Sequence, residues 1–203
     1  MPKQKMWIAG AACLAAVAAV PTVLVGCGGS SGTAQAAPSG IDPKKVADMV
    51  HEVMVADRTV YAKHIVTRLK KEASPITPDE YWNETTDGTT IPLPAQVFRM
   101  GAEIVNGKDV GFSYSLISEW PLNPKHTPES DIEKEGVKAI QNGEPFYGTE
   151  TIDGQEYLVA IYGDKAVAEA CWVCHNEHPN KGEDYPEFAE GDVMGGIIVR
   201  IPM

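Results

Sequence analysis

The chain has 203 residues, 43% of them hydrophobic, so it can form one globular domain with a core, and wholesale disorder is excluded. Its 28 acidic residues against 17 lysines and arginines give a net charge of −11, and no basic stripe runs along the sequence, so we expect no nucleic-acid partner. The 15 prolines and 19 glycines predict many turns, which favours a mixed fold over a helical bundle.

The amino terminus has the composition of an export signal. Lys3 and Lys5 precede an almost uninterrupted apolar stretch at residues 6–25, as in a secretory signal peptide. We therefore predict a removable signal at residues 1–26. An uncleaved anchor helix is the alternative, because the stretch is long enough to cross a bilayer. With either outcome the domain lies outside the cytoplasm.

A lipid attachment site is predicted directly after the signal. The Leu-Val-Gly-Cys sequence at 24–27 resembles the lipobox of bacterial lipoproteins, in which the cysteine is acylated. Acyl chains on Cys27 would anchor the protein to the membrane on its periplasmic side. Gly28 weakly favours the outer membrane. Residues 27–42 are small and polar, which predicts a flexible tether.

A long helix is predicted at residues 43–72. Asp42 suits the N-cap and Pro43 the first turn. At about 100° per residue, His64 falls at the centre of an apolar stripe, whereas His51 falls about 140° away on the polar side. The stripe comprises Val46, Met49, Val50, Val53, Val60 and Tyr61. We expect this stripe, with His64, to face the core.

The rest of the chain alternates short helices with strands. Asp153-Gly154, between two alternating segments, is the strongest hairpin signal. In chain order we predict a loop at 89–94, a short helix ending near 105, a strand at 110–118, a helix at 127–142, hairpin strands at 147–152 and 155–162, and a buried last strand at 195–201. The predicted fold class is α+β, with a long N-terminal helix followed by an antiparallel sheet.

The chemistry is concentrated in the sequence Cys-Trp-Val-Cys-His at 171–175. Cys171 and Cys174 have the spacing that attaches to the two vinyl groups of one haem, and His175 follows as the proximal iron ligand. The cysteine count agrees, because Cys13 leaves with the predicted signal and Cys27 takes the lipid. We therefore expect one covalent haem c. Two other interpretations are a structural zinc site, for which His178 and one distant His or Asp would supply the further ligands, and a thioredoxin-like redox pair.

The ligand on the opposite face of the iron is less well defined. His64 is the first candidate, because it lies mid-stripe on a helix that could pack over the haem. An empty sixth position is the alternative, and His126, in a proline-rich segment, is expected to be exposed. His178 is too close to His175 to reach the opposite face. The rival sulfur ligands are Met54, Met100 and Met194, and the candidate partners of the haem propionates are Arg58, Arg68 and Arg99.

Several motifs together resemble a known family, the c-type-haem domains with a PAS-like fold that were long catalogued as a domain of unknown function. The matching segments lie at 56–61, 91–94, 115–121, 171–176 and 191–195, within a domain at residues 43–203. The resemblance implies a PAS-like α+β domain with one haem beneath the long helix. It carries over Cys171, Cys174 and His175, but no distal ligand.

Members of that family occur alone or as extracytoplasmic input modules of histidine kinases and chemoreceptors. Because the sequence stops at Met203 without a transmitter, we expect a standalone cytochrome in periplasmic electron transfer or redox response, with a redox partner protein. A haem-based sensor of a small ligand at the iron is the alternative, and a zinc-bound structural lipoprotein is a further one. We expect no enzyme activity, because nothing places a peroxidase-like His and Arg pair.

Overall fold

The computed structural model describes residues 40–84 and 86–203. The predicted signal peptide, Cys27 and the tether up to residue 39 lie outside the described residues. The domain is α+β, as predicted from the sequence. Its helical elements are α1 (Pro43–Val60), η1 (Tyr61–Val66), α2 (Thr67–Lys71), α3 (Pro94–Asn106), η2 (Pro124–His126), α4 (Asp131–Ala139), η3 (Ile140–Asn142) and α5 (Glu169–Glu177). Its strands are β1 (Thr77–Pro78), β2 (Thr90–Ile91), β3 (Ser113–Ile117), β4 (Phe146–Ile152), β5 (Gln155–Lys165) and β6 (Val193–Pro202).

The long N-terminal helix has the extent that the sequence predicts. The Asp42 carboxylate accepts a hydrogen bond from the backbone N–H of Lys44 at 3.0 Å, and Pro43 occupies the first turn. The helix continues from α1 through η1, a π-helical segment, into α2. The apolar pattern of the sequence predicts a uniform α-helix and gives no signal for the π-helical segment.

The predicted buried face of this helix is wrong. Met49, Val53 and Val60 are 56%, 61% and 54% exposed, whereas Ala47, Ala62 and Val66 are buried. Within α1, the inward face that carries Ala47 is rotated by roughly 100° from the centre of the predicted stripe. It also carries His51, whose ring stacks on Tyr162 with the ring centroids 3.9 Å apart. Asp48, on the same face, accepts hydrogen bonds from the hydroxyl groups of Tyr147 and Tyr162 in the sheet, so the helix does not need a continuous apolar stripe.

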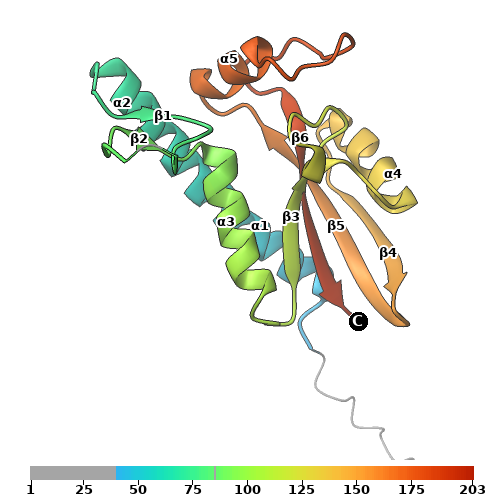
Figure 1. Cartoon of the computed structure of the whole chain (residues 1–203). Coiled ribbons are helices and arrows are strands. Elements are labelled where there is room, and N and C mark those ends of the chain that lie inside the picture. The colour runs from blue at the N-terminus through green and yellow to red at the C-terminus, as the bar shows by residue number, and fades with distance from the viewer. Residues whose placement is uncertain (1–39, 85) are drawn as a thin grey trace, which may run out of the picture. The chain divides into compact units, whose positions relative to one another are not determined.

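Four antiparallel strands form the sheet in the order β3-β6-β5-β4. The predicted hairpin is confirmed as β4 and β5. Asp153 and Gly154 both have positive φ, 51° and 82°, as a tight two-residue hairpin turn requires. The predicted last strand is confirmed as β6, which lies between β3 and β5 (Figure 1).

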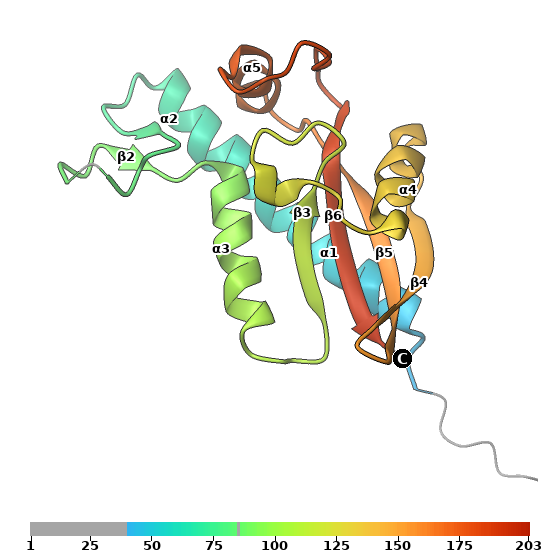
Figure 2. The ribbon, with the colours of Figure 1, turned by 45° about the vertical axis from the view of Figure 1, so that its right-hand side comes forward.

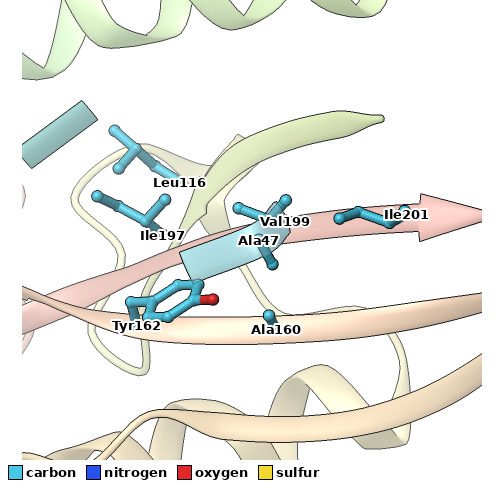
Figure 3. Packing of buried hydrophobic residues seen from close by; sticks show 7 residues of the cluster. All are labelled: Ala47, Leu116, Ala160, Tyr162, Ile197, Val199 and Ile201. Atoms are coloured by element: carbon cyan, nitrogen blue, oxygen red, sulfur yellow. The ribbon is translucent and has the colours of Figure 1, made fainter. Parts of the chain in front are cut away.

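Helices cover both faces of the sheet. On one face, α1 and α3 pack over a cluster in which Ala47 meets alternate residues of β3, β5 and β6 (Figure 3). This cluster comprises Ala47, Leu116, Ala160, Tyr162, Ile197, Val199 and Ile201. On the other face, α4 and η3 pack over Ile117, Val159, Ile161 and Ile198. Each fully buried isoleucine stabilises the fold by about 1.5–3 kcal/mol relative to an exposed one.

Two helices differ from the sequence prediction. Helix α4 begins at Asp131, four residues later than predicted, because Ser130 and Glu133 form a capping box there. Helix α5 was not predicted. It lies at the end of the sheet where β6 begins, whereas the carboxyl terminus lies at the other end (Figure 2). Within the described part of the chain, no helix is long and apolar enough to span a membrane.

Candidate functional site

Helix α5 carries the two cysteines of the motif. Cys171 and Cys174 are free thiols, and their spacing of three residues places them on the same face of the helix. Cys171 packs against a small cluster formed by Ala166, Phe188 and Met194. Burial, followed by the charge of Glu80, raises the pKa of the Cys174 thiol. The pair is thus held beside the core and remains available for covalent attachment.

A cavity that partly opens to solvent lies beside α5. Its walls come from α1, α3, β3 and the segment after it, and the ends of β5 and β6 that lie near α5. The ionisable and sulfur-containing lining residues are Arg58, Glu80, Arg99, His126, Asp164, Cys174, His175, His178 and Met194.

His175 is oriented by an aromatic pair. Its Nδ1 atom lies 2.7 Å from the Tyr185 hydroxyl group, and its ring meets Phe188 edge to face with the centroids 5.9 Å apart. Burial lowers the pKa of His175 to about 4, against an opposing effect of Asp164, so the imidazole is neutral at pH 7. Among the described residues Nε2 has no hydrogen-bond partner. A neutral imidazole held through Nδ1 suits an axial metal ligand.

An ion pair closes the cavity on the side of α1. The Arg58 guanidinium donates to the Asp164 carboxylate at 2.7 Å, and the two side chains are only 10% and 12% exposed. The other terminal nitrogen of Arg58, Nη1, is buried without a hydrogen-bond partner in the described part of the chain. A buried guanidinium nitrogen with no acceptor suits an anionic group that enters the cavity, such as a carboxylate.

Comparison with known proteins places the chain in a family. The model of the family described as Tll0287-like, Tll0287, matches residues 41–202. The chain belongs to the Tll0287-like family. A solved structure, described as the crystal structure of the cyanobacterial haem protein Tll0287, has a similar fold. It is 16% identical in sequence, with a TM-score of 0.53, and the alignment covers 80% of this chain and 97% of that one. A comparison with curated proteins gives no match.

These comparisons confirm the family resemblance and the PAS-like α+β fold inferred from the sequence. In this Tll0287-like chain the motif residues also fit the group that the motif implies. Cys171 and Cys174 are free on one helix face, and His175 lies at the cavity with its Nδ1 atom engaged. The unpartnered nitrogen of Arg58 could receive a haem propionate. Arg99 lines the same cavity, whereas Arg68 is exposed and pairs with Glu72.

The position predicted for His64 is wrong. This residue is exposed on η1 and does not line the cavity. The rotation of the helix explains the error, because the stripe in which His64 was centred faces away from the sheet. Of the sulfur candidates, Met194 lines the cavity, Met54 packs against the core beneath α1, and Met100 is half-buried on α3.

His126 was expected to be exposed, and this prediction is also wrong. The residue is half-buried at the end of η2 and lines the same cavity as His175. Burial, followed by the charges of Arg99 and Arg58, lowers the pKa of His126. The sequence holds one signal for this turn, the Asn123-Pro124 pair, in which the Asn123 side chain accepts from the Lys125 N–H at 3.0 Å.

Among residues 40–84 and 86–203, no group of three or more His, Cys, Asp or Glu side chains is arranged to hold a metal ion. His178, which was considered as a zinc ligand partner of the cysteines, instead lies with its Nε2 atom 3.4 Å from a carboxylate oxygen of Glu80.

Proposed function

We propose that this chain is an exported monohaem c-type cytochrome. Cys171 and Cys174 hold one haem c by thioether bonds, and His175 is its proximal iron ligand. The observation that carries this proposal is the joint placement of Cys174 and His175 on one cavity, with His175 fixed through Nδ1 by Tyr185. Membership of the Tll0287-like family supports it, since the similar solved structure is that of a haem protein.

Each residue of the site has a distinct part in holding the cofactor. When bound, the haem supplies a reversible one-electron change at its iron. With its proton on Nδ1, His175 would donate a hydrogen bond to the Tyr185 hydroxyl oxygen, which would leave the Nε2 lone pair free for the iron and increase its basicity. Arg58 and Arg99, which line the cavity, would bind the haem propionates, and Asp164 holds the Arg58 side chain in place.

The biological role that we propose is periplasmic electron transfer or redox response, with a redox protein as partner. Because the cavity partly opens to solvent, a haem bound in it would have an edge that a redox partner can approach. The acidic charge of the chain, −11, favours a partner with a basic contact surface. A lipid on Cys27 would hold the domain at the membrane.

Haem attachment is tested by expressing the full chain with a haem-maturation system. Haem should remain on the protein in a denaturing gel, and the pyridine haemochrome spectrum should be that of haem c. The double variant Cys171→Ala/Cys174→Ala should lose this haem, whereas Val173→Ala, between them, should keep it. A colourless parent, or a double variant that keeps covalent haem, would refute the proposal.

Electron transfer is tested on the same protein by redox titration and by exposure to carbon monoxide. A carrier should cycle reversibly between its two oxidation states without binding the gas. Ready binding of carbon monoxide would contradict electron transfer and favour a sensor of small ligands at the iron.

The lipid anchor is tested by metabolic labelling with a radioactive fatty acid. The parent and Cys13→Ala should be labelled and should sediment with membranes, whereas Cys27→Ala should be unlabelled. Equal labelling of all three proteins would contradict a lipid on Cys27.

A further inference from the structure

The five histidines of the chain all lie within the described residues, and their surroundings separate them into three groups. His51 stacks on Tyr162, where it packs against the sheet and not in the cavity beside α5. His64 is exposed on the helix. The remaining three, His126, His175 and His178, line the cavity.

Both ring nitrogens of His178 are already engaged. Its Nδ1 atom accepts a hydrogen bond from the backbone N–H of Asn180 at 3.1 Å, and its Nε2 atom lies 3.4 Å from a carboxylate oxygen of Glu80. His178 is also the C-cap residue of α5, one turn after His175, so it approaches the cavity from the same side. It therefore lacks both a free nitrogen and a position opposite His175.

Met194 also lines the cavity, but its side chain is committed to packing. It is 3% exposed and packs with Ala166 and Phe188, in the cluster that Cys171 and Trp172 of α5 contact. Its thioether thus belongs to the layer beneath α5, on the side of the cavity that His175 occupies.

His126 differs from all of these residues. In the described part of the chain, neither of its ring nitrogens has a hydrogen-bond or ion-pair partner. Its backbone is nevertheless held from two directions. The His126 carbonyl accepts from the Ser118 N–H at 2.8 Å, and the His126 N–H donates to the Asn123 carbonyl at 2.9 Å. The segment that carries it follows β3, on a different element from α5.

We propose that His126 is the second axial ligand of the haem iron, opposite His175. This inference rests on the proposed function, because it requires the haem that Cys171 and Cys174 would hold. An imidazole with uncommitted nitrogens on a fixed backbone needs little rearrangement to bind a metal. Two strong nitrogen ligands would give a six-coordinate iron, which suits electron transfer and closes the iron to exogenous ligands.

The test compares variants of the haem-loaded full chain by optical and electron paramagnetic resonance spectroscopy. The parent should be low-spin in both oxidation states and should not bind carbon monoxide. His126→Gly should lose the low-spin signal and bind carbon monoxide, and added imidazole should restore the parent spectrum. His64→Ala serves as the matched control, because His64 is exposed and does not line the cavity, and it should retain the parent spectrum.

A second variant addresses the case in which His126→Gly fails to fold. His126→Met should stay low-spin with a more positive reduction potential, because a thioether in place of an imidazole stabilises reduced haem iron. A parent that binds carbon monoxide, or a His126→Gly protein that remains low-spin without imidazole, would overturn the assignment. In both cases a positive haemochrome spectrum would leave the covalent haem of the proposed function standing, although carbon monoxide binding by the parent would contradict its electron-transfer role. A parent without haem would overturn the proposed function and this inference together.

Discussion

The Arg58–Asp164 ion pair should be a large local determinant of stability. The pair joins α1 to the end of β5 across 106 residues of sequence, with a nitrogen–oxygen distance of 2.7 Å. Removal of one partner leaves the other charge buried and unpaired, which typically costs about 3–5 kcal/mol. Because the side chains are 10% and 12% exposed, we expect the lower end of this range, about 3 kcal/mol. That cost corresponds to a more than hundredfold change in the folding equilibrium.

The assay is equilibrium unfolding in urea of the protein prepared without haem, in which no propionate contacts Arg58. Arg58→Met and Asp164→Leu should each destabilise strongly, and the double variant should be more stable than either single variant, because neither charge is then left unpaired. Arg68→Met is the matched control. Arg68 lies on the same helical run with its nitrogen 2.8 Å from Glu72, but the two side chains are 70% and 59% exposed. Its loss should change stability little or not at all. Equal effects at the two arginines, or additive effects in the double variant, would refute the reasoning.

Three further outcomes are expected. Gly136→Ala should destabilise by about 1–2 kcal/mol in urea unfolding, because the new Cβ would lie 2.2 Å from the Ile161 side chain; an unchanged midpoint would contradict this packing. Burial acts to raise the pKa of Glu133, but hydrogen bonds from Arg200 and two backbone N–H groups outweigh it and lower the pKa. Glu133 should therefore contribute its full stabilisation above pH 4.5, the ordinary pKa of a glutamate, and this contribution should be lost as the pH falls through the lowered pKa of the folded state. When unfolding midpoints are measured against pH, Glu133→Gln should show a weaker decline than the parent. Tyr185→Phe should retain haem but shift the reduction potential to more positive values, because the proximal imidazole loses a hydrogen-bond acceptor; redox titration with an unchanged potential would contradict that role.

The sequence predicts well those elements whose determinants are local. The Asp153-Gly154 turn was predicted because two adjacent residues of positive φ suffice to specify it. The run at 195–201 was predicted because β-branched residues that pack on both faces mark a central strand. The start of the long helix follows from Asp42 and Pro43 alone.

Determinants that lie far apart in the chain were missed. The inward face of α1 carries polar groups whose partners lie about a hundred residues away in the sequence. The periodicity of the apolar residues therefore predicted the wrong face of the helix as buried. The Asp48 carboxylate accepts hydrogen bonds from the hydroxyl groups of Tyr147 and Tyr162 at 2.6 and 2.8 Å, across 99 and 114 residues. Burial, followed by the bond to Asp48, raises the pKa of Tyr147 to about 12, so its hydroxyl group remains a donor at neutral pH. An apolar stripe therefore identifies a helix but not the face that the sheet will cover.

In the candidate site, too, the sequence predicts the residues of a local motif and misses those that come together only in the folded domain. Cys171, Cys174 and His175 could be found from their spacing, because the chemistry of attachment requires it. Tyr185 and Asp164 could not, because they join His175 and Arg58 only in the folded domain. His126 was misjudged because a proline-rich segment indicates a turn but not its direction, and here the turn leads the chain back to the cavity.

The central claim is that Cys171 and Cys174 carry one haem covalently, and mass spectrometry of the protein expressed with a haem-maturation system tests it most directly. The intact protein should be heavier than its polypeptide by one haem, and the added mass should be found on the peptide that contains both cysteines. An intact mass equal to that of the polypeptide, or a haem on any other peptide, would contradict the account.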